Sequence, residues 1–189
     1  TSAFYGSGYY FYDMNAKVNW RVSDKDRFYL SGYFGRDVFD FVNGRRSFDI
    51  DIPWGNSTLT ARWNHVFSPR LFANTTAVYN DYNFSFGARQ NDFQIRLQSG
   101  IRDYTLKTDF DYYPLTGHRV KFGAQYTFHR FTPSVVSGRQ DTTVFSPNNA
   151  QLKYAVETAL YAQDDWELGR RLKLNTGLRL SRFSQVGPY

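Results

Sequence analysis

Apolar and polar side chains alternate with a period of two along most of the chain. The stretch HRVKFGAQYTFHRFTP, residues 118–133, is the clearest case. Its apolar side chains are Val120, Phe122, Ala124, Tyr126 and Phe128, and the set between them is Lys121, Gly123, Gln125, Thr127 and His129. Alternation over this length predicts a β-strand with one apolar and one polar face.

The same pattern predicts about eight strands, and no segment shows a helical period. The predicted strands cover residues 10–22, 27–39, 57–67, 71–83, 93–113, 118–133, 152–167 and 172–183. Short polar turns alternate with three long irregular segments, at about 40–55, 84–92 and 133–151. This asymmetry is typical of outer-membrane barrels, so we predict an all-β fold, namely a segment of an antiparallel up-and-down transmembrane β-barrel.

The predicted strand at 93–113 changes phase along its length. Apolar residues stand at odd positions up to Ile101 and at even positions from Tyr104 onward. One extra residue shifts the alternation by one, so a β-bulge near 100–103 would restore a single apolar face. The alternative is two separate strands joined by a corner. We expect the bulge.

Three features favour lipid, rather than a protein core, against the apolar face. First, a large polar set is expected on the opposite face: Lys17, Arg62, Gln94, Arg96, Gln98, Lys107, Asp109, Asp111, Lys121, Gln125, Glu157, Gln163 and Arg179. Second, the predicted strands are much longer than the five or six residues common in globular proteins. Third, Trp20, Trp63 and Trp166 each lie near a strand end, where aromatic girdles meet the membrane interfaces. A soluble antiparallel sheet protein remains the alternative.

The composition agrees with a single domain in which large side chains, scattered among polar ones, supply most of the apolar character. The chain has 189 residues, of which 20% are aromatic, and the mean hydropathy is −0.57. It has no run of about 18 apolar residues, so no transmembrane helix is expected, whereas a barrel strand needs only about ten alternating residues. Cysteine is absent, which excludes disulfides and thiolate chemistry. The net charge of +6 is scattered, which argues against a nucleic-acid partner.

Candidate chemistry is sparse. His65, His118 and His129 are isolated, and none has a second ligand at metal spacing. Asp49 and Asp51 alternate within a predicted loop but fall short of a calcium-binding loop, so a solvated loop is the better interpretation.

A second acidic pair lies on a predicted strand. Asp109 and Asp111 share a face with Lys107 and are better explained as charges of a wet interior than as an acid–base pair. His129 is expected on the same polar face near one rim, where it could contact a ligand. Nucleophile elbows, phosphate loops and zinc motifs are absent. We therefore assign no catalytic, cofactor-binding or metal-binding residue, no cofactor, and no enzymatic activity.

Two stretches carry a resemblance to a known family. They are IRDYTLKTDFDYYPLTGHRVKFGAQYTFHRFTP, residues 101–133, and YAVETALYAQDDWELGRRLKLNTGLRLSRF, residues 154–183. The second is similar to a hairpin in which a Tyr-x-Gln-Asp-x-Trp strand is followed by a Gly-Leu-Arg strand. These patterns resemble the barrel of TonB-dependent receptors, in the style of Bacteroidota-type sequences, and the weaker first hundred residues fit the same repeat.

The resemblance implies a location in the cell outer membrane of a Gram-negative bacterium. It also implies a barrel of about 22 strands filled by a plug domain, and uptake of a scarce ligand powered by the TonB complex through a TonB box. The expected partners are outer-membrane lipid, the TonB complex and an extracellular ligand such as a siderophore, cobalamin or an oligosaccharide. We expect residues 1–189 to form a partial barrel domain without plug or TonB box, so contact with TonB would need other parts of a parent protein.

Two other functions remain open from the sequence. One is a small closed outer-membrane barrel of eight strands with a structural or adhesion role. The other is a soluble β-barrel that holds an apolar ligand, and a polar interior under an apolar exterior argues against it.

Overall fold

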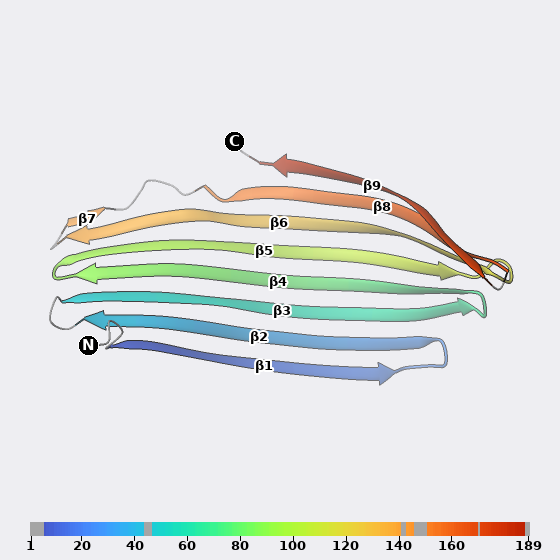
Figure 1. Ribbon diagram of the computed structural model, residues 1–189, viewed down its shortest axis with the longest axis horizontal. Coiled ribbons are helices and arrows are strands. Elements are labelled where there is room, and N and C mark those ends of the chain that lie inside the picture. Colours follow the sequence, from blue (N-terminus) through green and yellow to red (C-terminus); the bar gives the residue numbers. More distant parts are fainter. Residues whose placement is uncertain (1–5, 44–46, 141–142, 146–150, 170, 188–189) are drawn as a thin grey trace.

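The strands form one long antiparallel sheet in chain order (Figure 1). The computed structural model describes residues 6–43, 47–140, 143–145, 151–169 and 171–187. Its strands are β1 (Ser7–Arg21), β2 (Asp26–Asn43), β3 (Phe48–Ser68), β4 (Leu71–Gln90), β5 (Phe93–Tyr112), β6 (His118–Gln140), β7 (Thr143–Phe145), β8 (Lys153–Leu168) and β9 (Leu172–Val186). Each strand of the main path pairs with its neighbours in sequence, and β7 pairs only with β6. The predicted fold class is confirmed.

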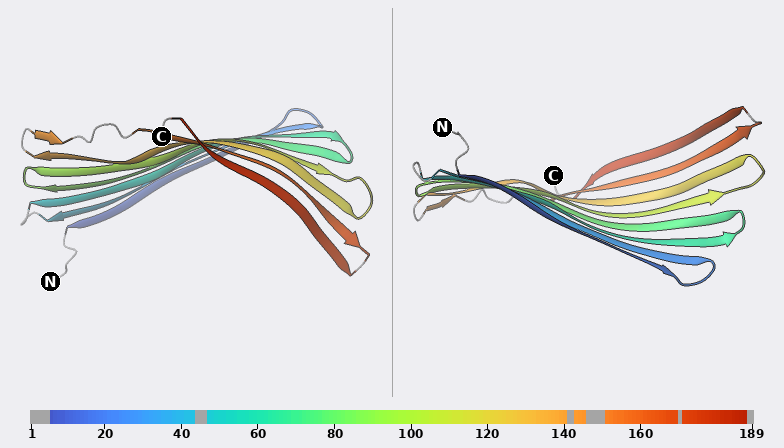
Figure 2. Two further views of the ribbon diagram at one scale, coloured as in Figure 1. Left: turned by 90° about the horizontal axis from the view of Figure 1, so that it is seen from above. Right: turned by 60° about the horizontal axis from the view of Figure 1, so that its bottom comes forward.

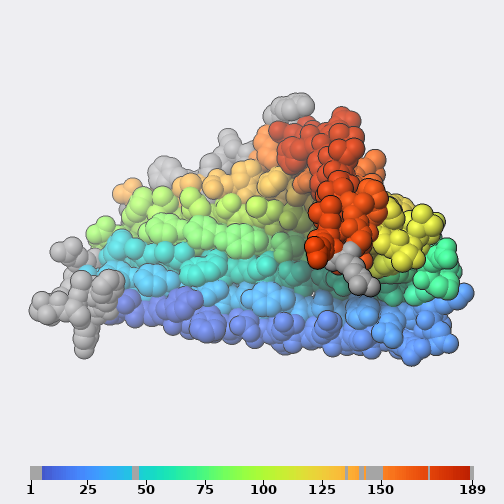
Figure 3. Space-filling view, turned by 45° about the vertical axis from the view of Figure 1, so that its right-hand side comes forward, coloured from blue at the N-terminus to red at the C-terminus, as the bar shows by residue number. Residues whose placement is uncertain are grey.

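The sheet is open, twisted and strongly bent (Figure 2). Figure 3 shows the strands as successive bands of colour, with the β8–β9 end curling forward. In the described part of the chain, β1 pairs only with β2 and β9 only with β8, so the two edge strands do not close onto each other. No large side chain among the described residues is fully buried, so there is no compact core.

Two of the three segments predicted as long connections are strand instead. β2 and β3 run through most of residues 40–55, and β4 continues to Gln90, where a two-residue turn begins. Asn91 takes a φ of 50° in that turn, a left-handed conformation that Asn tolerates well. Pro53 lies within β3, where the β3–β4 ladder skips Ile52 and Pro53, so its missing N–H interrupts that ladder only locally. The third segment contains the end of β6 and β7, and residues 141–142 and 146–150 lie outside the described residues.

The bulge predicted near 100–103 is wrong. β5 pairs with β4 without any register shift from Phe93 to Tyr112. The nearby irregularity is in the β5–β6 ladder, where Gly100 pairs with Thr132 but Gln98 pairs with Val135, so the extra residue belongs to β6. The change of phase in the sequence therefore marks a real exchange of apolar residues from one face of the sheet to the other.

The register places every side chain on one of two faces, because directly paired residues lie on the same side of a sheet. We call the face that carries Leu106 and Leu178 the outer face, and the opposite one the inner face. Leu178 and Leu180 on the outer face are 86% and 73% exposed. The buried polar side chains of the described residues, Asp111 and Thr127, lie on the inner face. Around these positions, large apolar groups thus stand outward, while polar groups are packed inward.

Candidate functional site

The outer face carries a continuous apolar band across the main sheet. Its middle consists of aliphatic and small residues: Ala16, Val18, Leu30, Leu59, Ala61, Ala77, Leu106, Ala124, Leu160, Ala162, Leu178 and Leu180. Aromatic residues border the band toward the short turns: Trp20, Phe28, Trp63, Phe110, Phe122 and Trp166. A second aromatic line borders it on the other side: Tyr12, Phe34, Tyr79, Tyr104, Phe128 and Tyr154. This order of layers is that of a lipid-facing barrel wall.

Many of the border rings contact each other across strands. Phe28 and Trp63 stack with centroids 6.1 Å apart, and Phe110 and Phe122 stack at 5.0 Å. Such offset pairs stabilise neighbouring strands beyond the burial of their area. The three tryptophans predicted at strand ends all lie in the border on the short-turn side, while Trp54 lies on the inner face.

At the level of the band, the inner face carries a network of charges. Lys107 Nζ lies 3.0 Å from Asp109 Oδ2, and the Tyr161 hydroxyl donates a hydrogen bond to Asp109. The Arg179 guanidinium lies 5.4 Å from the centre of the Tyr161 ring. Opposite charges and hydrogen bonds therefore satisfy this surface from several strands, as a wet lumen wall requires.

The two carboxylates that might have formed an acid–base pair have separate partners. Asp109 belongs to the network above, whereas Asp111 accepts two hydrogen bonds from Arg119, at 2.9 and 2.7 Å. The structure thus places both among charges of the inner face.

A glycine makes room for this network. Gly123 pairs with Tyr161, and a Cβ added at Gly123 would meet the Tyr161 hydroxyl and the carbonyl oxygen of Thr108. The ring of Tyr161 therefore lies over the bare backbone of β6. The packing of ring on glycine explains why a small residue stands in an otherwise regular strand.

Each of the three histidines pairs with an aspartate from a neighbouring strand. His65 Nδ1 lies 2.6 Å from Asp26, and His118 Nδ1 lies 2.7 Å from Asp164. The latter pair explains why an acidic residue is tolerated on the apolar outer face. Asp26 begins β2 at a short turn, and its hydrogen bond with His65, reinforced by Ser23 and Trp63, lowers its pKa to about 2.

The third histidine lies on the inner face, as predicted. His129 Nδ1 lies 2.7 Å from Asp103, and its Nε2 lies 3.9 Å from Glu157. The histidine partners were missed from sequence because 26 or more residues separate them from their histidines. The described residues contain no group of three or more side chains suited to hold a metal ion.

Beyond the band, the two faces exchange character. Asp49 and Asp51 lie on the outer face of β3, not in a solvated loop, and pair with Arg89 at 2.5 Å and Arg96 at 3.8 Å. Gln94, Arg96 and Gln98 also lie on the outer face, which corrects their expected place opposite the apolar band. Their misplacement follows from the change of phase in β5, which was taken for a bulge.

In the same region beyond the apolar band, the inner face carries aromatic and aliphatic side chains. Its apolar residues there are Tyr9, Phe39, Phe41, Ile50, Ile52, Trp54, Phe84, Phe86, Ile95 and Leu97, which we call the inner aromatic surface. Tyr9 and Trp54 stack with centroids 6.2 Å apart. The Tyr9 hydroxyl donates a 2.5 Å hydrogen bond to Asp37, which raises the pKa of Tyr9. This surface offers rings and a few polar groups to whatever enters from that end.

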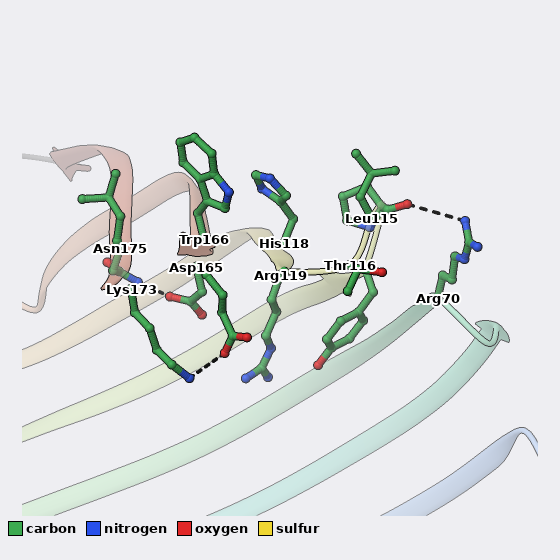
Figure 4. Close-up of a pocket in the computed structure, with 14 residues that line it drawn as sticks. Arg70, Leu115, Thr116, His118, Arg119, Asp165, Trp166, Lys173 and Asn175 are labelled. Atoms are coloured by element: carbon green, nitrogen blue, oxygen red, sulfur yellow. Dashed lines mark hydrogen bonds and ion pairs between the residues drawn. The ribbon is translucent and has the colours of Figure 1, made fainter. Parts of the chain in front are cut away.

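At the opposite, short-turn end lies a pocket of about 800 Å³ with mixed charges. Figure 4 shows side chains from the β5–β6 turn, β8 and β9 around it. Lys173 Nζ bonds Glu167 at 2.5 Å, which raises the pKa of Lys173. Arg70 donates a 3.5 Å hydrogen bond to the carbonyl of Pro114. The Lys173–Glu167 pair links β8 to β9, and the Arg70 bond links the β3–β4 turn to the β5–β6 turn, so these contacts stabilise the short-turn end of the sheet.

Together, the two-faced sheet, the aromatic borders and the charged inner wall define a transmembrane β-barrel wall. The sequence matches the family described as TonB dependent receptor-like, beta-barrel, over residues 1–188. The chain belongs to this family and lies in the outer membrane. The resemblance noted in the sequence is confirmed.

Solved structures show the same fold. The outer membrane transporter YddB from Escherichia coli superposes with a TM-score of 0.68 at 14% identity, covering 89% of this chain and 26% of that chain. BauA, the ferric preacinetobactin receptor from Acinetobacter baumannii, superposes with a TM-score of 0.66 at 10% identity. The match covers 95% of this chain and 34% of that chain. The chain thus spans about a quarter to a third of these structures. No curated protein sequence matches it, and no helix among the described residues is long and apolar enough to cross a membrane.

Proposed function

We propose that this chain forms part of the wall of a receptor that takes up a scarce extracellular ligand across the outer membrane. Membership of the TonB-dependent receptor-like family supports the transport role. The open edges of β1 and β9 support a place within a larger barrel rather than a small closed one. In this proposal the charged inner face lines the lumen, and the TonB complex supplies the energy through other parts of the receptor.

The observation that carries the ligand-capture role is the inner aromatic surface. Beyond the membrane band, aromatic side chains on an inner face that contacted only water would not stabilise the protein. Tyr9 is 56% exposed although it stacks on Trp54, so this ring is available to a ligand. Rings and hydroxyls together suit a ligand that has flat or apolar parts, such as a siderophore, cobalamin or an oligosaccharide.

An uptake experiment tests the proposal. A strain lacking the protein is offered radiolabelled ferric siderophores, cobalamin and oligosaccharides, with and without a functional TonB. We expect one of these to enter only when both the protein and TonB are present. Trp54→Ala should then weaken binding of that ligand, whereas the matched variant Trp20→Ala on the outer face should leave binding unchanged. Entry of every probe at the same rate in the strain without the protein would contradict the proposal.

A further inference from the structure

Two carboxylates stand on the inner face where the inner aromatic surface begins. Asp37 pairs across the sheet with Phe11 on β1 and with Trp54 on β3. Asp13 pairs with Gly35, which places it diagonally across from Asp37 on the same face. Diagonal neighbours in a sheet lie about 7–8 Å apart. The two negative charges therefore repel each other, and a cation between them would relieve the repulsion.

The described part of the protein supplies no cation to either carboxylate. Among the described residues, neither Asp13 nor Asp37 takes part in a salt bridge. The row that starts at Asp13 continues across the sheet through Gly35, Asn56, Tyr82 and Ile101. From this row to the strand ends away from the short turns, the described inner positions of β1–β5 hold no lysine or arginine. Arg36 precedes Asp37 in sequence but lies on the outer face.

Aromatic rings border Asp37. Phe11 and Trp54 flank it as direct partners, and the Tyr9 hydroxyl donates a 2.5 Å hydrogen bond to it. The centroid of the Tyr9 ring lies 6.1 Å from that of Phe11 and 6.2 Å from that of Trp54. Tyr9 and Phe11 are 56% and 65% exposed. Because ring faces attract a cation within about 6 Å of the centroid, the rings and the carboxylate favour the same ligand charge.

Gly35 brings polar groups of three strands together beside these rings. A Cβ added at Gly35 would meet the Tyr33 hydroxyl, so the Tyr33 ring lies over the bare backbone of β2. Asn56, the partner of Gly35 on β3, has its side-chain oxygen buried without a hydrogen-bond partner among the described residues. A buried acceptor without a donor is costly. Together with the Asp13 carboxylate, these acceptors suit a ligand that donates N–H groups.

A bare metal ion suits the position less well than an organic cation. Ca²⁺ takes about six to eight oxygen ligands, whereas this position offers two carboxylates, one amide oxygen and one hydroxyl. The neighbouring rings of Tyr9, Phe11 and Trp54 add no oxygen ligand except the Tyr9 hydroxyl, which is already bonded to Asp37. Rings beside a carboxylate are instead the arrangement that recognises ammonium groups.

We propose that the ligand of the inner aromatic surface carries a protonated amine beside a flat or apolar part. The amine lies between Asp13 and Asp37, and the flat part lies on the rings of Tyr9, Phe11 and Trp54. Ligands rich in carboxylate or phosphate are disfavoured, because the described inner positions here hold no arginine or lysine to bind them. This inference rests on the proposed uptake function and narrows its ligand to an amine-bearing one.

Isothermal titration calorimetry of the whole protein in a nonionic detergent tests this ligand class. The probes are tryptamine, tryptophol and indole-3-acetate, which share an indole ring and are cationic, neutral and anionic at neutral pH. The test variant combines Asp13→Asn and Asp37→Asn. The matched control combines Asp49→Asn and Asp51→Asn, which remove the same charge from the outer face beyond the band.

The wild type should bind tryptamine about tenfold more tightly than tryptophol, and indole-3-acetate more weakly than either. The test variant should bind tryptamine only as well as tryptophol, and its unchanged affinity for tryptophol would show that the ring surface is intact. The control should keep the wild-type preference. Equal affinities of the three probes for the wild type, a preference that survives in the test variant or is lost in the control, or displacement of tryptamine by an equal concentration of Ca²⁺ would each overturn the proposal.

The ligand class and the uptake function fail in different experiments, because calorimetry requires neither TonB nor transport. TonB-dependent uptake of an offered ligand without any preference for tryptamine would overturn the amine site and leave the uptake function in place. A clear preference for tryptamine in a protein that takes up none of the offered ligands would support the amine site and contradict the uptake function.

Discussion

A charge placed at Leu178 separates a lipid-facing sheet from a water-facing one. Leu178 lies on the outer face of β9, six residues from the start of the strand at Leu172 and four before Arg182, so it is near the middle of the apolar band. Its side chain is 86% exposed in the isolated chain. In water, Leu178→Arg would thus change the free energy of unfolding by no more than about 0.5 kcal/mol. At the centre of a bilayer the same change costs about 2–4 kcal/mol.

The measurement is equilibrium unfolding by urea of the protein folded into lipid vesicles, followed by tryptophan fluorescence. The expected loss corresponds to a folding equilibrium about 30- to 700-fold less favourable. Ser181→Arg is the matched control, because it adds the same charge to the inner face of the same strand. Equal effects of the two substitutions would refute the assignment of faces, and recovery of the wild type as a monomer without detergent would refute the membrane location.

Three further predictions concern the short-turn end and the lumen wall, and urea unfolding measures each of them. The pKa of Asp26 is lowered chiefly by its hydrogen bond with His65, so its stabilising effect is present above the ordinary carboxylate range and is lost as the pH falls through about 2. Asp26→Asn should therefore be less stable than the wild type at neutral pH, and the gap should close toward pH 2; a gap independent of pH would contradict this. Gly123→Val should cost about 1–3 kcal/mol, since the new side chain enters the space of the Tyr161 ring; an unchanged midpoint would show that the ring moves freely. Tyr161→Phe should cost about 1–2 kcal/mol because Asp109 loses a hydrogen bond, and no loss would mean that water replaces the hydroxyl.

The strands within the membrane band were predictable because each residue there is apolar if it faces lipid and polar if it faces the interior of the barrel. In β8, for example, the alternation alone puts Val156, Leu160 and Trp166 on one face and Glu157 on the other, and the register places them so. Even the mixed pattern of β2 is resolved by its pairing, since Leu30 lies between the outer-face residues Val18 and Ala61. A period of two needs no partner strand to be recognised.

The regions beyond the band were not predictable in the same way, because the rule changes there. Ile95 and Leu97 are apolar and Arg96 is polar, as in a membrane strand, but here the apolar residues point inward. Without the neighbouring strand, such a reversal is indistinguishable from a bulge. The histidine–aspartate pairs were hidden for a related reason: only register brings His118 near Asp164, 46 residues away in sequence.

The reversal and four outer-face arginines locate the same boundary independently, since Arg36, Arg102, Arg130 and Arg182 each lie 10 to 12 residues from the short-turn end of their strand. The reversal occurs where β5 passes from Tyr104 to Ile101, and Arg102 stands between them. A strand that leaves the hydrocarbon no longer has to turn its apolar residues outward, and a cation becomes favourable where lipid phosphates begin. If the boundary is placed correctly, an arginine moved from position 102 four residues toward the short turn, as in Leu106→Arg, should destabilise the folded protein by about 2–4 kcal/mol. The same residue moved four positions the other way, as in Gln98→Arg, should be tolerated. Equal tolerance at both positions in vesicle unfolding would place the boundary elsewhere.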